Sequence, residues 1–456
     1  MKITLSLFFG LSRDIENRRT TITPQIFKPI NFDEHRYAKL AWHYNQGHGF
    51  VYSNNDKYFS YADSLPAYRS TAFPPTLPVI IHIGYQRLYS EFSPLTQSHI
   101  DDLSSKYYVL FAFVINLISL VLFLISLPYF RFLALKFCYN VELSRWLTVF
   151  YILLPSALVY IGLFVCYENL VTPILVIVTS ILLKAYSQVA LKKIELAMVP
   201  IVTVIATGFR PHATLSFLLL FAIVSLAFAK YVLTFRTNNI PLIAVLTFTF
   251  LLMLCYNLAV IFKNNESIGL KVVSTQQAQA IFLGHQPYTR GSWNGDSETK
   301  GSDVYSFRVT HIPGLDTITS EATLYKEHLR VAADWIANNP SRFVWLEFRK
   351  LAMFMLPYNF MNLHFNALSA AINLGFVLFL MMILLDKSMI NITSLMIGGV
   401  VLGAFLMTVI SFFNHRFVSY AMPFMLLLAG VAYYQILVKI STRWPALFKF
   451  VKGNSR

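Results

Sequence analysis

NALSAAINLGFVLFLMMILLDKSMINITSLMIGGVVLGAFLMTVISF, residues 366–412, contains two apolar runs separated by a short turn with Asp386 and Lys387. Each run has about the 20 residues that an α-helix needs to cross the hydrocarbon core of a bilayer. Neither run contains an ionisable side chain. This stretch predicts two consecutive membrane helices, and the rest of the chain repeats the pattern.

Nine apolar runs of this kind occur in the sequence, at 107–128, 147–165, 170–187, 195–209, 214–234, 240–262, 366–386, 389–412 and 417–438. The 456 residues are 56% hydrophobic and 13% charged, whereas globular domains average about 45–50% apolar and about 25% charged residues. This composition argues against a soluble single-core protein. We predict an all-α polytopic membrane protein, a helical bundle with about nine to eleven spans and two outer-face loop regions that carry interfacial helices.

The cysteines and histidines give no sign of a metal centre. Cys138, Cys166 and Cys255 form no CxxC pair and no even set, so neither a disulfide framework nor a zinc site is indicated. The histidines show no i, i+4 pair with a carboxylate on a clear helix face, which favours a polar outer surface over a metal site. The sequence indicates no certain cofactor, and a divalent cation stays open.

The formal net charge of +15 comes from 37 Lys and Arg against 22 Asp and Glu. In a soluble protein this excess would suggest nucleic acid as a partner, but in a polytopic membrane protein basic loops set the orientation. The basic residues gather in alternate connections and in the tail: Arg131, Lys136, Arg145, Lys184, Lys192, Lys193, Lys230, Arg236, Lys387, Lys439, Arg443, Lys449, Lys452 and Arg456. The positive-inside rule therefore predicts that these connections and the C-terminus are cytoplasmic.

The same rule divides the chain by side of the membrane. The predicted segments are 1–105, an N-terminal piece and first outer loop; 106–262, six spans; 263–365, the second outer loop; 366–438, three spans; and 439–456, a basic cytoplasmic tail. Residues 3–12 are apolar but too short to cross a bilayer, so we expect them to be the end of a first helix that begins upstream, with a signal peptide as the alternative.

The first outer region begins with an amphipathic pattern. Tyr37, Leu40, Ala41 and Tyr44 repeat at i, i+3, i+4 and i+7, which predicts a helix along the membrane surface. Asp33 lies just ahead of this helix, where a carboxylate is a favoured N-cap.

The second outer region closes with two predicted helices. A helix over 320–338 is ended by Asn339 and Pro340. In the stretch that follows, Arg349 and Lys350 lie among aromatic and aliphatic residues, which favours an interfacial helix with snorkelling basic groups over a true span.

Several motifs together resemble the polyprenyl-phosphate-sugar-dependent membrane glycosyltransferases of the GT-C fold, the group with protein O-mannosyltransferases and the lipid A aminoarabinose transferase. The motifs are Asp33, Glu34, Tyr37 and Ala41; GHGF at 47–50; Tyr68, Arg69, Pro74, Pro75 and Pro78; Pro155 with Tyr167, Glu168 and Asn169; Gly208, Arg210 and Pro211; VVSTQQAQAIFLGHQPYTRGSW at 272–293; WIANNPSRFVWLEFRKL at 335–351; and His415, Arg416 and Pro423. They follow the family order over about residues 31 to 430.

The resemblance implies an inverting glycosyltransferase that moves a sugar from a polyprenyl-phosphate donor to a lipid, glycan or protein acceptor on the outer face of the membrane. Such a reaction needs a base for the acceptor and positive charge for the departing phosphate. Asp33 is the candidate base, with Glu34 as the alternative or a partner that orients the acceptor. The candidate substrate-binding residues are Arg69, Arg210, Arg416 and Lys350 for the phosphate, Glu168 for the sugar or a catalytic cation, Tyr37 and Tyr68 for the sugar or lipid, and His415 beside Arg416.

Structural explanations stand beside these roles. Arg210 and Arg416 lie at predicted span ends, where snorkelling is ordinary, and Arg69 could be a solvated loop residue. Glu168 could cap a turn, Lys350 could merely snorkel, and the tyrosines could belong to an aromatic belt.

Two other functions remain open at this point. A flippase or transporter for a lipid-linked glycan would predict broken helices in two similar halves and charges within spans, which the sequence lacks. A glycan ligase or polymerase would use a lipid-linked oligosaccharide, and the early acidic loop disfavours it. The resemblance also implies a bacterial inner membrane location with the active face outside, membrane lipids as surroundings and no nucleic-acid partner.

Overall fold

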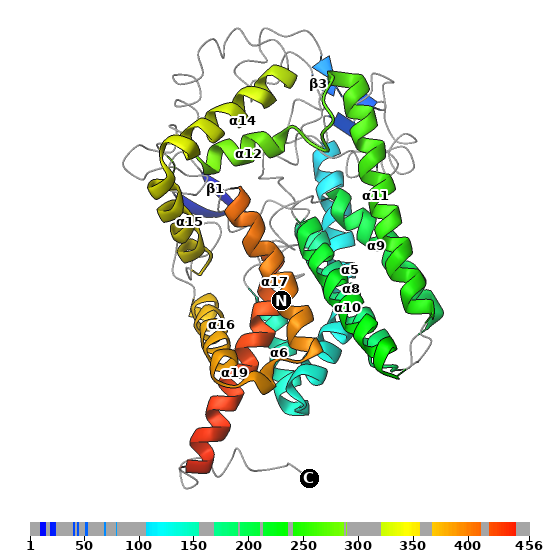
Figure 1. Cartoon of the computed structure of the whole chain (residues 1–456), viewed down its shortest axis with the longest axis vertical. Coiled ribbons are helices and arrows are strands. Elements are labelled where there is room, and N and C mark those ends of the chain that lie inside the picture. Colours follow the sequence, from blue (N-terminus) through cyan, green and yellow to red (C-terminus); the bar gives the residue numbers. More distant parts are fainter. Residues whose placement is uncertain are drawn as a thin grey trace.

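The computed structural model describes residues 10–14, 19–23, 40–41, 43–44, 51–52, 68–69, 79, 106–154, 168–189, 192–209, 213–235, 240–286, 289, 321–355, 367–411 and 419–443. Within them the protein is a helical bundle with a layer of helices at one end (Figure 1). The bundle helices are α5 (Lys106–Cys138), α6 (Val141–Leu153), α8 (Glu168–Tyr186), α9 (Lys193–Phe209), α10 (Thr214–Phe235), α11 (Ile240–Ile268), α16 (Ala367–Leu385), α17 (Ile392–Ile410) and α19 (Met422–Arg443), with the short 3-10 helix η4 (Lys387–Met389). The end layer contains α12 (Gln276–Gly284), α14 (Glu321–Asn338) and α15 (Pro340–Phe354).

Five helices of the described part are long and apolar enough to cross a membrane. They cover Leu117–Cys138, Leu242–Glu266, Ala367–Leu385, Ile392–Ile410 and Met422–Arg443, and Leu170–Tyr186 and Thr214–Ala229 are shorter apolar helices. The chain is therefore an integral membrane protein of helical type, as the apolar runs predict. The larger number of nine to eleven spans stays a prediction.

Small residues let α10 and α17 pack closely. Gly399 and Gly403 are four residues apart on α17, and a Cβ at Gly403 would come within 2.5 Å of the Cα atom of Ser216 on α10. The Ser216 hydroxyl donates across the same contact to the Val400 carbonyl at 2.9 Å. This spacing of small residues is the pattern by which membrane helices approach one another.

Polar contacts join the bundle helices at the end opposite the α12, α14 and α15 layer. The Tyr129 hydroxyl of α5 donates to Glu195 of α9 at 2.7 Å, and Lys184 of α8 lies 3.4 Å from the same carboxylate. The Asn140 amide donates to the Tyr434 hydroxyl of α19 at 3.0 Å. One of the basic residues of the predicted cytoplasmic connections, Lys184, thus contacts the carboxylate of a neighbouring bundle helix.

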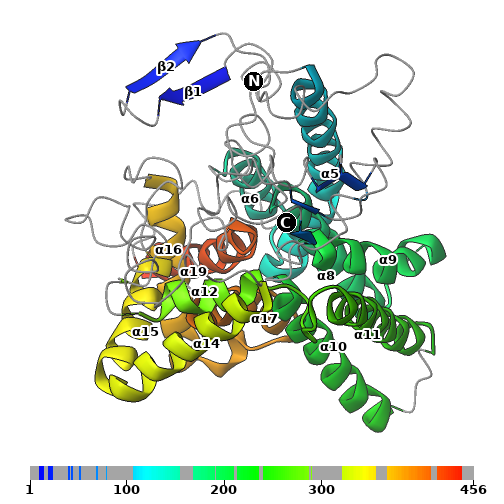
Figure 2. The same ribbon diagram turned by 90° about the horizontal axis from the view of Figure 1, so that it is seen from above.

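The end layer covers only part of the bundle. Seen from above, α12 and α14 lie over α17 and α19, whereas α9, α10 and α11 stand to one side (Figure 2). α14 ends at Asn338, directly before Asn339 and Pro340 as the sequence predicts, and Pro340 begins α15. The side chain of Asn339 donates to the Trp335 carbonyl at 3.0 Å and so caps the end of α14.

The described N-terminal residues form short strands. β1 (Gly10–Asp14) pairs antiparallel with β2 (Arg19–Thr23), from Gly10 opposite Thr23 to Asp14 opposite Arg19. The prediction that 3–12 form the end of a helix is therefore wrong for residues 10–12, because pairing with a segment further along the chain outweighs the local apolar run. Residues 3–9 lie outside the described part.

The predicted amphipathic helix of the first outer region is helical where it is described. Residues 40, 41, 43 and 44 have helical conformation. Leu40 and Ala41 are buried in the main hydrophobic core, and Tyr44 is exposed. The apolar stripe of this helix therefore packs on protein at these positions, and its placement along the membrane surface stays a prediction.

Candidate functional site

A lysine lies on the buried face of α15. Leu346, Lys350 and Phe354, spaced by four residues, are the buried residues of this helix. The spacing places all three on one face. Lys350 is 0% exposed, which is rare for a lysine unless it is paired. Its burial therefore calls for polar partners.

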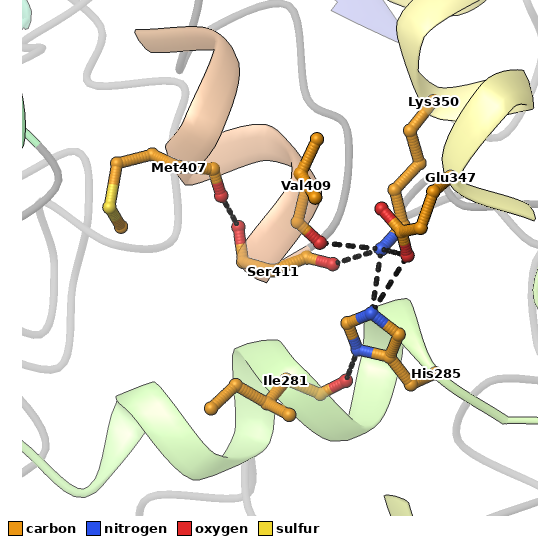
Figure 3. A network of polar contacts seen from close by, with 7 residues as sticks. All are labelled: Ile281, His285, Glu347, Lys350, Met407, Val409 and Ser411. Atoms are coloured by element: carbon orange, nitrogen blue, oxygen red, sulfur yellow. Dashed lines mark hydrogen bonds and ion pairs between the residues drawn. The ribbon is translucent and has the colours of Figure 1, made fainter. Parts of the chain in front are cut away.

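Four polar atoms surround the Lys350 ammonium group (Figure 3). Nζ donates to Oε1 of Glu347 at 2.8 Å, one turn earlier on α15. It also donates to the carbonyl oxygens of Val409 at 3.0 Å and Ser411 at 2.8 Å, at the end of α17. The fourth neighbour is Nε2 of His285, 3.0 Å away at the end of α12. We call Lys350, Glu347 and His285 the ionic cluster.

His285 connects α12 to this cluster through both ring nitrogens. Nδ1 lies 2.8 Å from the Ile281 carbonyl, which can only accept, so Nδ1 carries the proton. Nε2 lies 3.0 Å from Oε1 of Glu347 and 3.0 Å from Nζ of Lys350. Nε2 therefore lies within hydrogen-bond distance of both the ammonium group and the carboxylate. The histidine is the third member of the cluster, beside a cation and an anion.

Burial dominates the electrostatics of Lys350. Desolvation lowers the pKa of its ammonium group from 10.5 to about 8, and the neighbouring Glu347 carboxylate limits the fall. The lysine is therefore predominantly charged at neutral pH and loses its proton near pH 8. Among the described residues, Oε2 of Glu347 is buried without a hydrogen-bond partner, so that carboxylate can accept one more donor.

The outward face of α15 is apolar. Val344, Trp345, Phe348 and Leu351 are 52%, 70%, 61% and 38% exposed. Large apolar side chains on the exposed face of a helix beside membrane spans favour contact with the lipid interface. The interfacial character predicted for this stretch is thus supported, but the predicted snorkelling of Lys350 is wrong, because its side chain points into the protein.

The remaining predicted site residues are described only in part. Asp33, Glu34, Tyr37, Arg210, His415 and Arg416 lie outside the described residues. Tyr68 and Arg69 form strand β4, which pairs antiparallel with β3 (Val51–Tyr52), Val51 opposite Arg69. The backbone at Arg69 is thereby paired with Val51, the residue that follows the GHGF motif in the sequence. Glu168 is the first residue of α8.

Sequence reasoning singled out Lys350 and missed Glu347 and His285 as its partners. A signal for Glu347 was present, because residues three apart on a predicted helix share a face and a Glu there can pair with a Lys. No comparable local signal existed for His285, 65 positions away in the sequence. Among the described residues no group of three His, Cys, Asp or Glu side chains could hold a metal ion. A divalent cation stays a prediction.

Comparison with solved structures gives a similarity to the archaeal oligosaccharyltransferase AglB from Archaeoglobus fulgidus, in complex with an inhibitory peptide and a dolichol-phosphate. The TM-score is 0.46 and the sequence identity 12%. The match covers 100% of this chain and 51% of that chain, so this chain spans about half the length of the AglB chain. No protein-family model matches the chain, and no curated protein matches it.

Proposed function

We propose that this protein is an inverting glycosyltransferase that moves a sugar from a polyprenyl-phosphate donor to a lipid, glycan or protein acceptor at the outer membrane face. One observation carries the proposal. His285 and Lys350 belong to two separate motifs of the family resemblance and meet 3.0 Å apart at the end of α17. The chain continues from there toward His415 and Arg416, which belong to a third motif. Convergence of motifs that are distant in sequence is typical of a functional site.

The proposed reaction is a direct displacement at the anomeric carbon of the sugar. The acceptor hydroxyl or amine forms the new bond to this carbon while the bond to the phosphate oxygen breaks, and the phosphate leaves with the bonding electrons. Asp33 takes the acceptor proton, with Glu34 orienting the acceptor. Arg210 and Arg416 pair with the departing phosphate, because a guanidinium binds phosphate in a planar, bidentate manner. A lipid phosphate is a good leaving group, so no general acid is required.

The remaining residues are divided between the phosphate and the sugar or lipid of the donor. Arg69 and His415 are proposed as further phosphate ligands, and Glu168, Tyr37 and Tyr68 as contacts to the sugar or the lipid. The first outer loop in 1–105 and the second in 263–365 then form the substrate-binding side, above spans in 106–262 and 366–438. The proposed location is a bacterial inner membrane, with the tail 439–456 in the cytoplasm.

The test uses the purified full chain in lipid nanodiscs with polyprenyl phosphates that each carry one hexose or pentose. Asp33→Asn is compared with Glu34→Gln, which alters the neighbouring carboxylate in the same way. We expect Asp33→Asn to lower turnover by roughly 10²- to 10⁴-fold, the usual contribution of a general base, and Glu34→Gln to act less. Full transfer by Asp33→Asn would remove Asp33 as the base.

Mass spectrometry of lipids that copurify with the protein tests the donor class independently. We expect a monosaccharide linked to polyprenol through one phosphate. An oligosaccharide on a polyprenyl diphosphate would instead support a ligase or polymerase. If that lipid copurifies and the protein transfers sugar from none of the monosaccharide donors, the proposal is overturned.

A further inference from the structure

We propose that Lys350 is a positioning residue: with Glu347 and His285 it pins the last turn of α17 and thereby sets where the chain toward His415 and Arg416 begins. Its effect on sugar transfer rests on the proposed function. The pin itself does not, because it concerns only contacts among α12, α15 and α17.

The end of α17 presents carbonyl groups that need donors. The last carbonyls of a helix have no partner within the helix. The Ser411 backbone N–H donates to the Met407 carbonyl at 3.1 Å, and its hydroxyl donates to the same oxygen at 2.6 Å. Val409 and Ser411 offer their carbonyls to Lys350 instead (Figure 3). A cation at the negative end of a helix dipole is favourable, so the lysine caps α17 by hydrogen bonding and by charge.

The ammonium group has partners on α12, on α17 and on α15, the helix that carries the lysine. α17 carries no ionisable side chain, so the groups that face Nζ are His285 from α12, Glu347 from α15 and the two α17 carbonyls. His328 of α14 stacks on Phe282 of α12 and is not among the hydrogen-bond partners given for Nζ. Three helices that are separate in sequence therefore meet at one ammonium group.

The same contacts argue against a direct role in phosphate binding. An ammonium group has three N–H donors, and Glu347, Val409 and Ser411 accept all three. The side chain is 0% exposed. A phosphate could reach Nζ only by displacing one of these acceptors. The lysine uses its donors to bind the end of α17, and Glu347 balances its positive charge.

The first test compares Lys350→Met, which keeps an unbranched chain but removes the donors, with Lys326→Met, an exposed lysine on α14. Hydrogen exchange is followed by mass spectrometry on peptides that cover the end of α17. We expect faster exchange there in Lys350→Met and no change in Lys326→Met. Unchanged exchange in a folded Lys350→Met protein would overturn the proposal whether or not the protein transfers sugar.

The second test separates positioning from ligand binding by kinetics. We expect Lys350→Met to lower kcat by about 10- to 100-fold, as misplacement by about 1 Å does, with little change in KM for the polyprenyl-phosphate sugar. A large rise in KM with unchanged kcat and unchanged exchange would instead identify Lys350 as a phosphate ligand. If wild-type protein transfers no sugar, the proposed function fails, while the exchange experiment still decides on the pin.

The third test uses pH and does not depend on the folding of Lys350→Met. Because the ammonium form is needed for three donations, wild-type kcat should fall as pH rises through about 8. Glu347→Gln removes the carboxylate that favours the charged lysine and should move this alkaline limb to lower pH. Lys350→Arg, which stays charged, should remove the limb. Identical profiles in wild type and Glu347→Gln would contradict the proposal.

Discussion

Lys350 is fully buried on a helix whose opposite face is exposed and apolar. Both faces of α15 are apolar, because Leu346 and Phe354 flank the lysine on one face while Trp345 and Phe348 occupy the other. Hydropathy alone cannot decide which of two apolar faces packs on protein. The buried side became clear only through contacts with α12 and α17.

The buried lysine also predicts an unusual dependence of stability on pH. Its pKa in the folded protein is about 8, against 10.5 for an ordinary lysine. Between these values the unfolded state binds more protons than the folded state, so the free energy of unfolding rises with pH, by about 3 kcal/mol over the window at 1.36 kcal/mol per pKa unit. Kcat should fall over part of the same range.

Unfolding midpoints of wild type and Lys350→Met, measured from pH 7 to pH 10.5, isolate this contribution. Titration of other lysines and tyrosines is common to both proteins and cancels in the difference. We expect the unfolding midpoint of wild type to rise relative to that of Lys350→Met as pH increases. A constant difference would show that the Lys350 pKa is the same in both states.

At the scale of elements, apolar runs and proline positions predicted most helices of the described part. The predicted helix at 320–338 corresponds to α14, and Pro340 begins α15. The short strands were missed because β1 and β2 depend on pairing between segments, which a ten-residue apolar run does not reveal. Helices depend on local periodicity, whereas strands depend on partners.

The close approach of α10 and α17 predicts that glycines of the same helix will differ sharply in tolerance. At Gly403 a Cβ would lie 2.5 Å from the Ser216 Cα, a backbone atom that cannot move without separating the helices. Gly403→Ala should therefore destabilise the protein by about 1–3 kcal/mol, the usual cost of overpacking. At Gly398 a Cβ would meet nothing within 4 Å.

Gly398→Ala is thus the matched control on the same helix. It should leave stability unchanged or raise it slightly, because alanine favours helices by about 0.5–1 kcal/mol over glycine. The measurement is the unfolding midpoint of each variant in one detergent. Equal effects of the two substitutions would mean that α10 and α17 do not touch at Gly403.

The outward face of α15 predicts contact with lipid at Trp345. This side chain is 70% exposed, whereas Trp335 on α14 is 8% exposed. In vesicles of brominated lipids, Trp345→Phe should remove part of the quenchable fluorescence, because bromine quenches only tryptophans that reach the acyl region. Trp335→Phe should leave the quenchable part unchanged. The opposite pattern would place α15 away from the membrane.

At the scale of the whole molecule, the ionic cluster lies at the end of α17 and the turn with Lys387 lies at its beginning. The 19 residues of α17 span about 28 Å at 1.5 Å per residue, close to the thickness of a bilayer core. Loop charge predicts on which side of the membrane each of these ends lies, because the orientation follows from the order of spans, whereas the ionic cluster could not be predicted without three-dimensional contacts.

The predicted orientation implies that two exposed positions, Ala333 on α14 and Ser388 in η4, are accessible from opposite sides of the membrane. In protein with its native cysteines replaced by serine, a membrane-impermeant maleimide should label Ala333→Cys from outside intact spheroplasts. Ser388→Cys should react only after the membrane is opened, because the positive-inside rule places the Lys387 turn in the cytoplasm. The reverse result would move the proposed donor side to the cytoplasm. Labelling of both positions from outside would mean that α17 does not cross the membrane, since the two sites lie at its opposite ends.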